Sequence, residues 1–427
     1  MKVMVIGGGG REHAVIRKLR ENPDITELYA LPGNAGMAGD ATCVPIGAKD
    51  IASIVSFAED NAIDYAVVTP DDPLVLGCVD ALEEIGVPCF GPRSEAAQIE
   101  GSKVFAKNLM KKYGIPTARY EVFTEPEAAL AYVRSCPIPI VVKADGLALG
   151  KGVVVARSRE EAEDAVRESM ENHKFGKSGE RLVIEEFLEG PEVSVLAFTD
   201  GKTLVPMVSS MDHKCAWDGD KGPNTGGMGV YSPVPMVTPE ELATMTGIME
   251  RVVRQLAKDG TQYSGCLYGG FMLTPEGPKV LEFNARFGDP ETQVVLPRMH
   301  ADLVEVMLAC DNGTLSPDMV SWEDDWAVAV VLASAGYPGS YEKGKVITGI
   351  EQAETLPGVT VYHAGTKLLD DGTLVTSGGR VLAVTAVAAT FEAARERAYE
   401  AAELIRFDGR FFRTDIGMKA IIGRENL

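Results

Sequence analysis

The sequence predicts a protein of mixed α/β and α+β class, with a doubly wound parallel sheet at its N-terminus and a strand-rich domain at its C-terminus. Its 427 residues are 45% hydrophobic and 24% charged, which is ordinary for a globular chain. At about 150 residues per domain, this length indicates about three domains. Short apolar runs alternate with helical stretches over the first hundred residues, whereas strands dominate after residue 326. We therefore expect domains over residues 1–100, 101–325 and 326–427.

The N-terminal domain shows apolar runs of strand length separated by helical stretches. This alternation is the pattern of a parallel, doubly wound sheet. We expect strands at Lys2–Ile6, Glu27–Ala30, Tyr65–Thr69 and Val87–Phe90, and helices at Arg11–Glu21, Asp50–Asn61 and Pro73–Ile85.

The middle domain combines helices, strands and one long polar segment. Capping boxes predict the starts of three helices, at Thr124-x-x-Glu127, Ser158-x-x-Glu161 and Thr238-x-x-Glu241. The dipeptide Asp200-Gly201 predicts a hairpin in which Val193–Phe198 pairs antiparallel with Leu204–Ser209. Further strands are expected over residues 138–144, 152–156, 182–187, 265–273 and 279–284. The Gly- and Pro-rich stretch 211–235 predicts a long loop, which in a compact domain is usually functional.

The charge balance disfavours two classes of partner. The chain has 41 basic and 62 acidic residues, for a net charge of −21. Such an acidic surface repels nucleic acid and anionic lipid. The best apolar run, Trp326–Ala335, falls short of the roughly 18 residues of a membrane span. Seven cysteines occur without a C-x-x-C pair, which argues against structural zinc and disulfides and indicates a reducing cytoplasm.

The first glycine-rich loop, Gly7-Gly8-Gly9-Gly10-Arg11-Glu12-His13, lies between the first expected strand and helix. Backbone N–H groups at such a helix start can bind phosphate. The dinucleotide fingerprint G-x-G-x-x-G fails, because Glu12 stands where its last glycine would be. The loop therefore predicts phosphate binding without a dinucleotide, and a tight turn without a ligand remains the alternative.

The second glycine-rich loop runs from Lys143 to Gly152 and includes Gly146, Gly150 and Lys151. It is not a Walker A loop, because only three residues separate Gly146 from Gly150 and a glycine follows Lys151. Lys143 ends an apolar strand, where its ammonium group is costly unless it meets an anion. We expect a flap over phosphates, and an ordinary hairpin with solvated lysines is the alternative.

The third glycine-rich segment follows Asp212-His213-Lys214 and spans Gly222–Gly229. So many glycines let the backbone approach a ligand closely. A disordered surface loop is the alternative interpretation.

Side chains alternate along Leu281–Phe287. Glu282, Asn284 and Arg286 share one face of the expected strand, while Leu281 and Phe283 belong to the core face. A carboxylate and an amide oxygen at adjacent same-face positions suit Mg²⁺, and an arginine can bind a carboxylate or phosphate through two hydrogen bonds. A half-exposed strand with a surface ion pair is the alternative.

Another apolar strand ends in Glu185-Glu186, and Glu192 follows. The edge of such a strand can bind adenine through backbone groups, and a nearby carboxylate can bind ribose hydroxyls. Taken alone this pattern is weak, because acids at strand ends are usually solvated.

The order of these motifs resembles the ATP-grasp superfamily. The shared features are Gly101-Ser102-Lys103, Lys143 with its glycine flap, a hinge at Glu185-Glu186-Phe187-Leu188, and Glu282-x-Asn284-x-Arg286. Within that superfamily the chain is most similar to the phosphoribosylamine–glycine ligase family, also called glycinamide ribonucleotide synthetases. The similar segments are 9–14, 32–36, 222–229 and 286–293, and the resemblance covers the whole chain.

The resemblance implies a central ATP-grasp domain with a mobile lid at about residues 115–187. It implies ATP, glycine and 5-phosphoribosylamine as substrates and Mg²⁺ or Mn²⁺ as the metal. The products would be glycinamide ribonucleotide, ADP and phosphate, formed through glycyl phosphate in de novo purine synthesis.

The resemblance also assigns roles to residues. Catalytic roles fall to Arg286, Lys143 and Asp212, and the metal would be held by Glu282 and Asn284. ATP would be bound by Lys103, Lys143, Gly146, Gly150, Lys151, Gly152, Glu185, Glu186, Phe187, Leu188 and Glu192. The other substrates would be bound by Gly8, Gly9, Gly10, Arg11, Glu12, Asp212, Lys214, Thr225, Gly226, Gly227 and Arg286.

Three positions depart from the family pattern. Cys215 stands where relatives usually carry arginine, Thr69-Pro70-Asp71 where Gly-Pro-Glu is common, and Gly8 where asparagine is frequent. The near alternative is another ATP-grasp carboxylate–amine ligase. A nucleotide-binding regulatory protein without turnover is a further alternative, against which the intact Glu282 and Asn284 speak.

Overall fold

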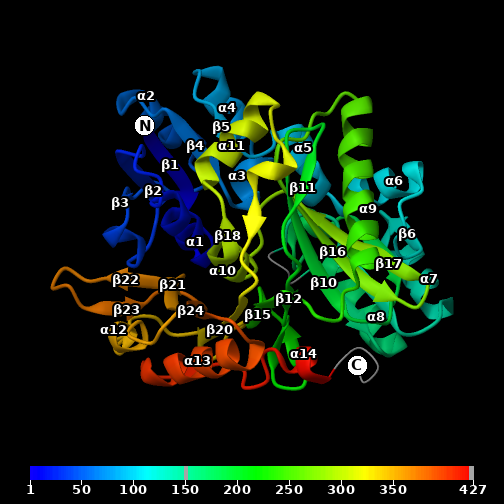
Figure 1. Ribbon diagram of the computed structural model, residues 1–427. Helices are drawn as coiled ribbons and strands as arrows, with labels where there is room; N and C mark the ends of the chain where they lie inside the picture. Colours follow the sequence, from blue (N-terminus) through cyan, green and yellow to red (C-terminus); the bar gives the residue numbers. More distant parts are fainter. Residues whose placement is uncertain (149–151, 423–427) are drawn as a thin grey trace.

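The computed structural model describes residues 1–148 and 152–422. Figure 1 shows the N-terminal sheet in blue above the C-terminal sheet in orange, with the central sheet in green beside both. Within these described ranges, no helix combines the length and the apolarity that a membrane crossing requires.

The N-terminal sheet is parallel and has the strand order β3-β2-β1-β4-β5. Its strands are β1 (Lys2–Gly7), β2 (Glu27–Pro32), β3 (Thr42–Cys43), β4 (Tyr65–Val68) and β5 (Cys89–Phe90). The order extends from β1 in both directions, which confirms the expected doubly wound sheet. Its helices are α1 (Gly10–Leu19), α2 (Ile51–Asp60), α3 (Asp71–Val75) and α4 (Cys78–Glu84).

One expected helix of this region is wrong. The stretch Pro73–Ile85 forms two helices, α3 and α4, and the break falls at Gly77. Gly77 has a φ of +85°, a left-handed conformation that glycine adopts without steric cost, so the helix cannot continue through it.

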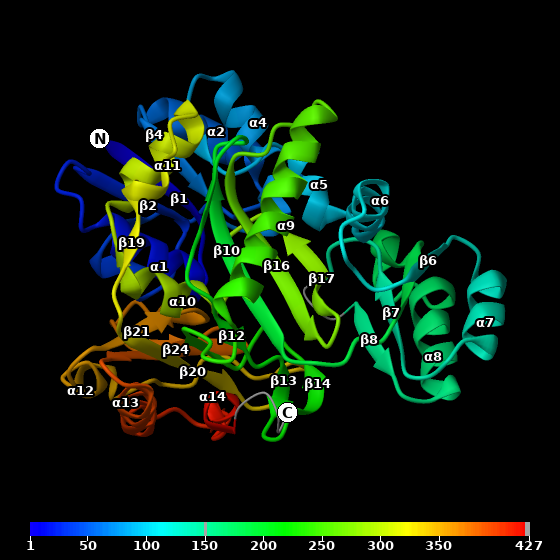
Figure 2. The same cartoon turned by 45° about the vertical axis from the view of Figure 1, so that its right-hand side comes forward.

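A second sheet of four antiparallel strands lies at the right of Figure 2, apart from the other sheets. Its order is β6-β9-β7-β8, with β6 (Tyr120–Phe123), β7 (Ile140–Ala144), β8 (Val153–Ala156) and β9 (Leu182–Glu186). Helices α7 (Pro126–Ser135) and α8 (Arg159–Val166) pack on it through their own small apolar core. We call this unit the lid sheet.

The structure agrees with the helix starts expected at Thr238 and Ser158 and contradicts the one expected at Thr124. Thr238 caps α9 (Pro239–Lys258) with a complete box, as expected. Ser158 accepts a hydrogen bond from the Glu161 backbone N–H at the start of α8. The box at Thr124 is wrong: α7 begins at Pro126 and Glu125 is its N-cap. Proline favours the first helical position, so Pro126 sets the start one residue later.

The central sheet has the antiparallel order β11-β10-β16-β17. Its strands are β10 (Glu192–Thr199), β11 (Leu204–Pro206), β16 (Gly265–Thr274) and β17 (Gly277–Asn284), flanked by α5 (Ser94–Gly101), α6 (Lys103–Tyr113) and α9. The pairing of β10 with β11 confirms the hairpin expected at Asp200-Gly201.

The register of β17 shifts at Leu281. Gly270 of β16 faces Glu282, but the next residue, Phe271, faces Val280, so Leu281 is an extra residue in the strand. The expectation that Leu281 belongs to the core is therefore wrong: it is half-buried and lines the cavities described below.

The C-terminal sheet has the order β12-β15-β20-β24-β21. Its strands are β12 (Met211–Asp212), β15 (Gly229–Ser232), β20 (Trp326–Ser334), β21 (Val359–His363) and β24 (Arg380–Ala388), with α13 (Phe391–Leu404) packed on it. The short β25 (Arg410–Phe411) also pairs with β20. The sheet thus includes two strands that precede residue 326.

The long loop expected over residues 211–235 is wrong. This stretch contains β12 and β15 and also a hairpin of β13 (Cys215–Trp217) with β14 (Lys221–Asn224). The main partner of β15 is β20, which lies far along the chain, so no local pattern indicates the strand.

The remaining strands and α-helices lie outside the four sheets described above. They are β18 (Met299–His300), β19 (Ser321–Trp322), β22 (Thr366–Leu368), β23 (Leu374–Thr376), α10 (Thr292–Val295), α11 (Leu303–Asn312), α12 (Ile350–Ala353) and α14 (Met418–Ile422).

Candidate active site

Two adjoining cavities lie between the sheets. The first, of about 460 Å³, is lined from the N-terminal region by Arg11 and Asp71 and from the C-terminal region by Tyr337 and Arg380. The second, of about 650 Å³, lies along the lid sheet and the 212–226 segment. Both are lined by Lys143, Gly226, Glu282, Asn284, Arg286 and Asp289, so they form one continuous site.

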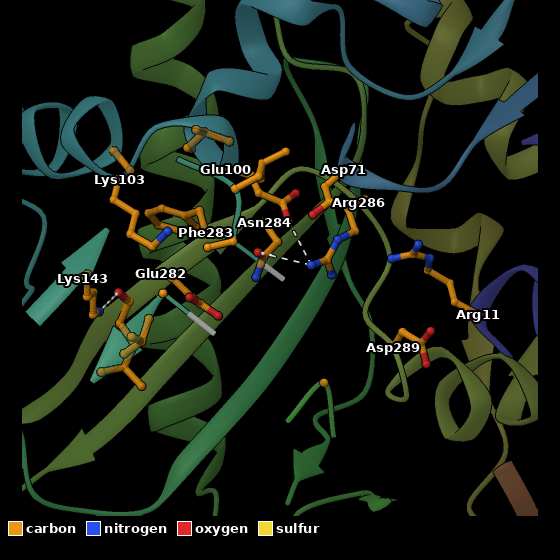
Figure 3. Close-up of a pocket in the computed structure, with 18 of the residues that line it drawn as sticks. Arg11, Asp71, Glu100, Lys103, Lys143, Glu282, Phe283, Asn284, Arg286 and Asp289 are labelled. Atoms are coloured by element: carbon orange, nitrogen blue, oxygen red, sulfur yellow. Dashed lines mark hydrogen bonds and ion pairs between the residues drawn. The ribbon is translucent and has the colours of Figure 1, made fainter. Parts of the chain in front are cut away.

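Glu282 and Asn284 lie where the two cavities meet. They come from the same face of β17, as expected, and Figure 3 shows them between the lysines on one side and Arg286 on the other. Burial alone would raise the pKa of Glu282, but the ammonium groups of Lys214, Lys143 and Lys103 hold it down at about 2. The carboxylate is therefore ionised, and with the Asn284 amide it offers the hard oxygen donors that Mg²⁺ or Mn²⁺ prefers.

Lys143 has a protein anion as its partner. Its ammonium group and that of Lys107 both form ion pairs with the Glu185 carboxylate. The Lys107 and Glu185 side chains are only 3% and 2% exposed. Burial by itself would raise the pKa of Glu185, and the two lysines lower it below the ordinary value. We call these three residues the Glu185 triad.

Lys107 was not among the expected site residues. It lies four positions after Lys103 on α6, and residues at this spacing share a face of a helix. Lys107 could have been predicted from this spacing. The Lys103 ammonium donates to the Gly146 carbonyl at 3.0 Å, which links α6 to the loop after β7.

The expected hinge spans the end of β9, with Glu185 and Glu186 in the strand and Phe187 and Leu188 after it. Glu186 accepts hydrogen bonds from the backbone N–H of Arg119 at 3.0 Å and from its guanidinium at 2.7 Å. The Phe187 ring lies 5.8 Å from the Arg157 guanidinium. Glu186, Phe187, Leu188 and Glu192 all line the second cavity.

The other residues expected to bind ATP lie in different parts of the site. Glu192 forms an ion pair with Lys214 across the second cavity. Gly152 lines the first cavity, and Gly146 lies beside Ser178. Gly150 and Lys151 lie outside the described residues.

Arg286 lies just after β17. Its guanidinium is 2.9 Å from Glu100 and donates to the Asn284 side chain at 3.5 Å (Figure 3). Its Nε is buried and has no hydrogen-bond partner among the described residues. Burial raises the pKa of Glu100 to about 7, although Arg286 opposes this shift. Glu100 is a second residue that the sequence did not single out.

Asp212, Thr225 and Gly226 line the second cavity, and Gly227 packs behind them against Asp212. Gly227 has a φ of +117°, and a Cβ there would lie 2.6 Å from an Asp212 carboxylate oxygen. Only glycine therefore fits beside this carboxylate. Thr225 fixes the turn, because its hydroxyl accepts from the Gly227 N–H at 3.0 Å and donates to the Lys214 carbonyl at 2.8 Å.

Burial raises the pKa of Asp212 well above its ordinary value, and the nearby Glu291 carboxylate raises it further. An acid whose pKa is raised by folding destabilises the folded state as the pH climbs past its unfolded-state value. Asp212→Asn is therefore expected to melt at a higher temperature than the unsubstituted protein at about pH 8. The difference should shrink towards about pH 4, where the unfolded aspartate also takes up a proton.

Thermal melts at the two pH values measure this effect. Asp370→Asn, at an exposed position, is the matched control and should change neither melt. Equal melting temperatures for Asp212→Asn and the unsubstituted protein at both pH values would contradict the prediction.

The first glycine loop joins β1 to α1 beside Asp289. The Gly9 N–H donates to the Glu12 carboxylate at 2.6 Å, and the Arg11 guanidinium donates to the Phe287 carbonyl at 3.2 Å. Among the described residues no acceptor faces the N–H groups of Gly10 and Arg11. Gly8 packs tightly, because a Cβ there would lie 2.6 Å from the Gly33 carbonyl oxygen.

Comparisons with known proteins cover most of the chain. Family models described as the N, ATP-grasp (A) and C domains of phosphoribosylglycinamide synthetase match residues 1–100, 101–292 and 327–419. The chain is 50% identical over 425 residues to phosphoribosylamine–glycine ligase of Halalkalibacterium halodurans, covering 99% of this chain and 98% of the relative. It is 49% identical over 425 residues to the Vibrio vulnificus protein of the same name, covering 99% of both chains.

Solved structures give the same result. The crystal structure of Thermotoga maritima phosphoribosylamine–glycine ligase superposes with a TM-score of 0.84 at 37% identity, covering 98% of this chain and 100% of that one. The biotin carboxylase domain of Hydrogenobacter thermophilus 2-oxoglutarate carboxylase, solved with MgADP, has a TM-score of 0.73 at 17% identity. It covers 96% of this chain and 91% of its own, and it shares the fold.

Proposed function

The chain belongs to the phosphoribosylglycinamide synthetase family, and from this premise we propose how its residues divide the work of the ligation. The protein is an ATP-dependent C–N ligase of purine biosynthesis. Its reaction joins glycine to 5-phosphoribosylamine and yields glycinamide ribonucleotide, ADP and phosphate. The observation that carries this proposal is the meeting of two cavities at Glu282, Asn284 and Arg286, beside three lysines.

ATP is assigned to the second cavity. Phe187 and Leu188 follow the lid strand β9 and would contact the adenine base there. The triphosphate would extend towards Lys143, which lines both cavities, and Lys103, which lines the first. Lys143 has three N–H donors, so it can contact phosphate with donors that Glu185 does not occupy, and Lys107 also pairs with that carboxylate.

Glu282 and Asn284 would hold the divalent cation that accompanies ATP, with Mg²⁺ or Mn²⁺ as the proposed ion. When bound, such a cation neutralises charge on the transferring phosphoryl group. The low pKa of Glu282 keeps the carboxylate available as a ligand across the physiological pH range.

The substrate glycine is a zwitterion, so its binding site needs a positive charge for the carboxylate and a negative charge for the ammonium group. The Arg286 guanidinium offers a cation for the glycine carboxylate, and its unpartnered Nε supports this assignment. Asp212 also lines the second cavity and would bind the glycine ammonium group, whose positive charge would offset the burial and the Glu291 repulsion that raise the pKa of this carboxyl group.

The chemistry follows from the weakness of a carboxylate as an acylating group. A glycine carboxylate oxygen takes the γ-phosphoryl group of ATP, which gives ADP and glycyl phosphate. The amine of phosphoribosylamine then attacks the acyl carbon, and phosphate leaves. Both steps require chiefly alignment and stabilisation of negative charge, which Lys103, Lys143 and Arg286 would supply. Water would hydrolyse the acyl phosphate, so a closed hairpin between β7 and β8 would protect it.

Phosphoribosylamine is assigned to the first cavity, with its phosphate at the start of α1. The free N–H groups of Gly10 and Arg11 and the helix dipole favour an anion at this point. An Asp289 carboxylate oxygen lies 3.4 Å from the position of a Gly9 Cβ, and Asp289 lines both cavities, so the loop lies next to their junction.

Gly9→Val is expected to raise the Michaelis constant for phosphoribosylamine by about tenfold or more, because a side chain there obstructs close approach of the phosphate. ATP binding should be nearly unchanged, since the ATP site is formed by other parts of the chain. Gly9 has a φ of −96°, which valine also adopts, but a Cβ there would lie 2.8 Å from a Glu12 carboxylate oxygen, so the Glu12 side chain must shift and a thermal melt controls for folding.

Kinetics with varied phosphoribosylamine and varied ATP measure the two constants. Gly47→Val is the matched control, because nothing lies within 4 Å of its Cβ position. A folded Gly9→Val protein that loses ATP affinity and keeps its phosphoribosylamine response would assign the loop to the nucleotide instead.

The proposed reaction is tested by ADP release with and without glycine, while phosphoribosylamine is generated in the assay. Release that requires both compounds is the expected result. Release with a different carboxylate or amine, and none with glycine, would instead identify another ATP-grasp ligase.

A further inference from the structure

We propose that Arg380 and Tyr337, both from the C-terminal region, are positioning residues for the amino-acid subsite. Together they hold the Gly226 residue of the segment that packs against Asp212. This inference rests on the proposed function, because it assigns Asp212 to glycine.

Arg380 stands at the start of β24 and binds two loops of the site at once. Its Nη1 donates to the Gly226 carbonyl at 2.7 Å, to the Asp289 carbonyl at 2.9 Å and to the Gly227 carbonyl at 3.4 Å. Its Nη2 lies 3.2 Å from the Asp289 carboxylate. One guanidinium therefore connects the 222–229 segment to the turn that follows Arg286.

Tyr337 binds the same residue, Gly226, at its backbone N–H group. The Gly226 N–H donates to the Tyr337 hydroxyl at 3.0 Å. Both the N–H and the C=O of Gly226 are thus bound by side chains from beyond residue 326. We call Arg380 and Tyr337 the Gly226 clamp.

The clamp acts on Asp212 through close packing. A Cβ at Gly226 would lie 3.0 Å from the Arg380 Cζ, and a Cβ at Gly227 would lie 2.6 Å from the Asp212 carboxylate. The segment is therefore in tight contact with the clamp on one side and with Asp212 on the other. A shift of Gly226 must move Gly227 and alter the space beside the Asp212 carboxylate.

The clamp also directs backbone dipoles. Three carbonyl oxygens, of Gly226, Gly227 and Asp289, point at one guanidinium. Carbonyl oxygens without a hydrogen-bond donor repel anions. Because Arg380 binds these three oxygens, the cavity can more easily accept a carboxylate and phosphates. Arg380 lines the first cavity at this point, so its charge also remains close to the bound substrates.

The test compares Arg380→Met, Arg380→Lys and Tyr337→Phe with the unsubstituted full-length protein. Arg380→Met is expected to raise the Michaelis constant for glycine by about tenfold or more, because small displacements of a substrate-positioning loop are costly. Affinity for MgADP, measured by calorimetry, should stay within about twofold, since the nucleotide site contains neither residue. Arg380→Lys should restore part of the glycine affinity, because an ammonium group can still donate to the carbonyls.

Tyr337→Phe keeps the ring and removes one acceptor, so a smaller rise of roughly threefold is expected. Arg406→Met is the matched control, because Arg406 is 61% exposed and belongs to the same region of the chain. It should leave both glycine and nucleotide constants unchanged.

Two results would overturn the clamp. The first is an unchanged glycine constant in folded Arg380→Met and Tyr337→Phe proteins. The second is an equal loss of glycine and MgADP affinity, which would indicate general disruption. If Arg380→Met fails to fold, Arg380→Lys and Tyr337→Phe decide the question by the same readouts. An unsubstituted protein without glycine-dependent ADP release would overturn the proposed function and the clamp together.

Discussion

Glu282→Ala is expected to abolish most divalent-metal-dependent turnover while the protein stays folded. The substitution removes the one carboxylate of the proposed metal site and leaves Asn284 as its remaining expected ligand. Metal stabilisation of phosphoryl transfer is worth several kcal/mol, so a fall in turnover of at least about a hundredfold follows. The side chain is part of a strand face that lines a cavity, so little packing is lost.

The same variant should keep or increase its affinity for metal-free ATP. The charges of Lys214, Lys143 and Lys103 act on Glu282, and these lysines lose a competing anion when it is removed. Glu276→Ala, on the turn before the same strand and 77% exposed, is the matched control. Steady-state rates across a Mg²⁺ titration measure the effect, and near-normal turnover of Glu282→Ala at saturating Mg²⁺ would exclude the assignment.

Lys143→Met is expected to weaken ATP binding or turnover by roughly ten- to a hundredfold. Methionine keeps the length of the side chain and removes the charge, and a hydrogen bond to a charged group is worth about 1.5–3 kcal/mol. Little stability should be lost, because Lys107 remains to neutralise Glu185.

Calorimetric titration with ATP and steady-state kinetics separate the two effects. Lys174→Met, on an exposed lysine of the lid region that pairs with Glu168, is the control. Should ATP affinity and turnover both match those of the unsubstituted protein, Lys143 would serve only to neutralise Glu185.

The sequence predicted four of the five strands of the N-terminal sheet, because each of these four is a short apolar run near a helix. Val3, Met4, Val5 and Ile6, for example, are completely buried in β1. The sequence missed β3, whose two residues, Thr42 and Cys43, form no apolar run. The short pairing strands were missed for a physical reason. β12 and β15 take their places from contacts with residues far along the chain, and their own composition is that of a loop.

Residues of the candidate site could be predicted where they lie close together in the sequence on one face of an element. Glu282 and Asn284 are two residues apart on a strand, and their shared face is found in the structure. Glu100, Tyr337 and Arg380 had no local signal, because each acts through a contact with a distant segment. The roles of the individual side chains and the domain boundaries remain predictions that the proposed variants address.

Strand β15 has a consequence for how the chain folds as it is made. It ends at Ser232, whereas its partner β20 begins only at Trp326. At about 5–20 residues per second, a ribosome needs roughly 5–20 s to synthesise the intervening stretch. During that interval the backbone groups of β15 that later pair with β20 have no partner, and an unpaired strand edge can associate with another chain. The nascent protein therefore exposes this unpaired strand until β20 emerges, and a ribosome stall within residues 233–325 would prolong this period.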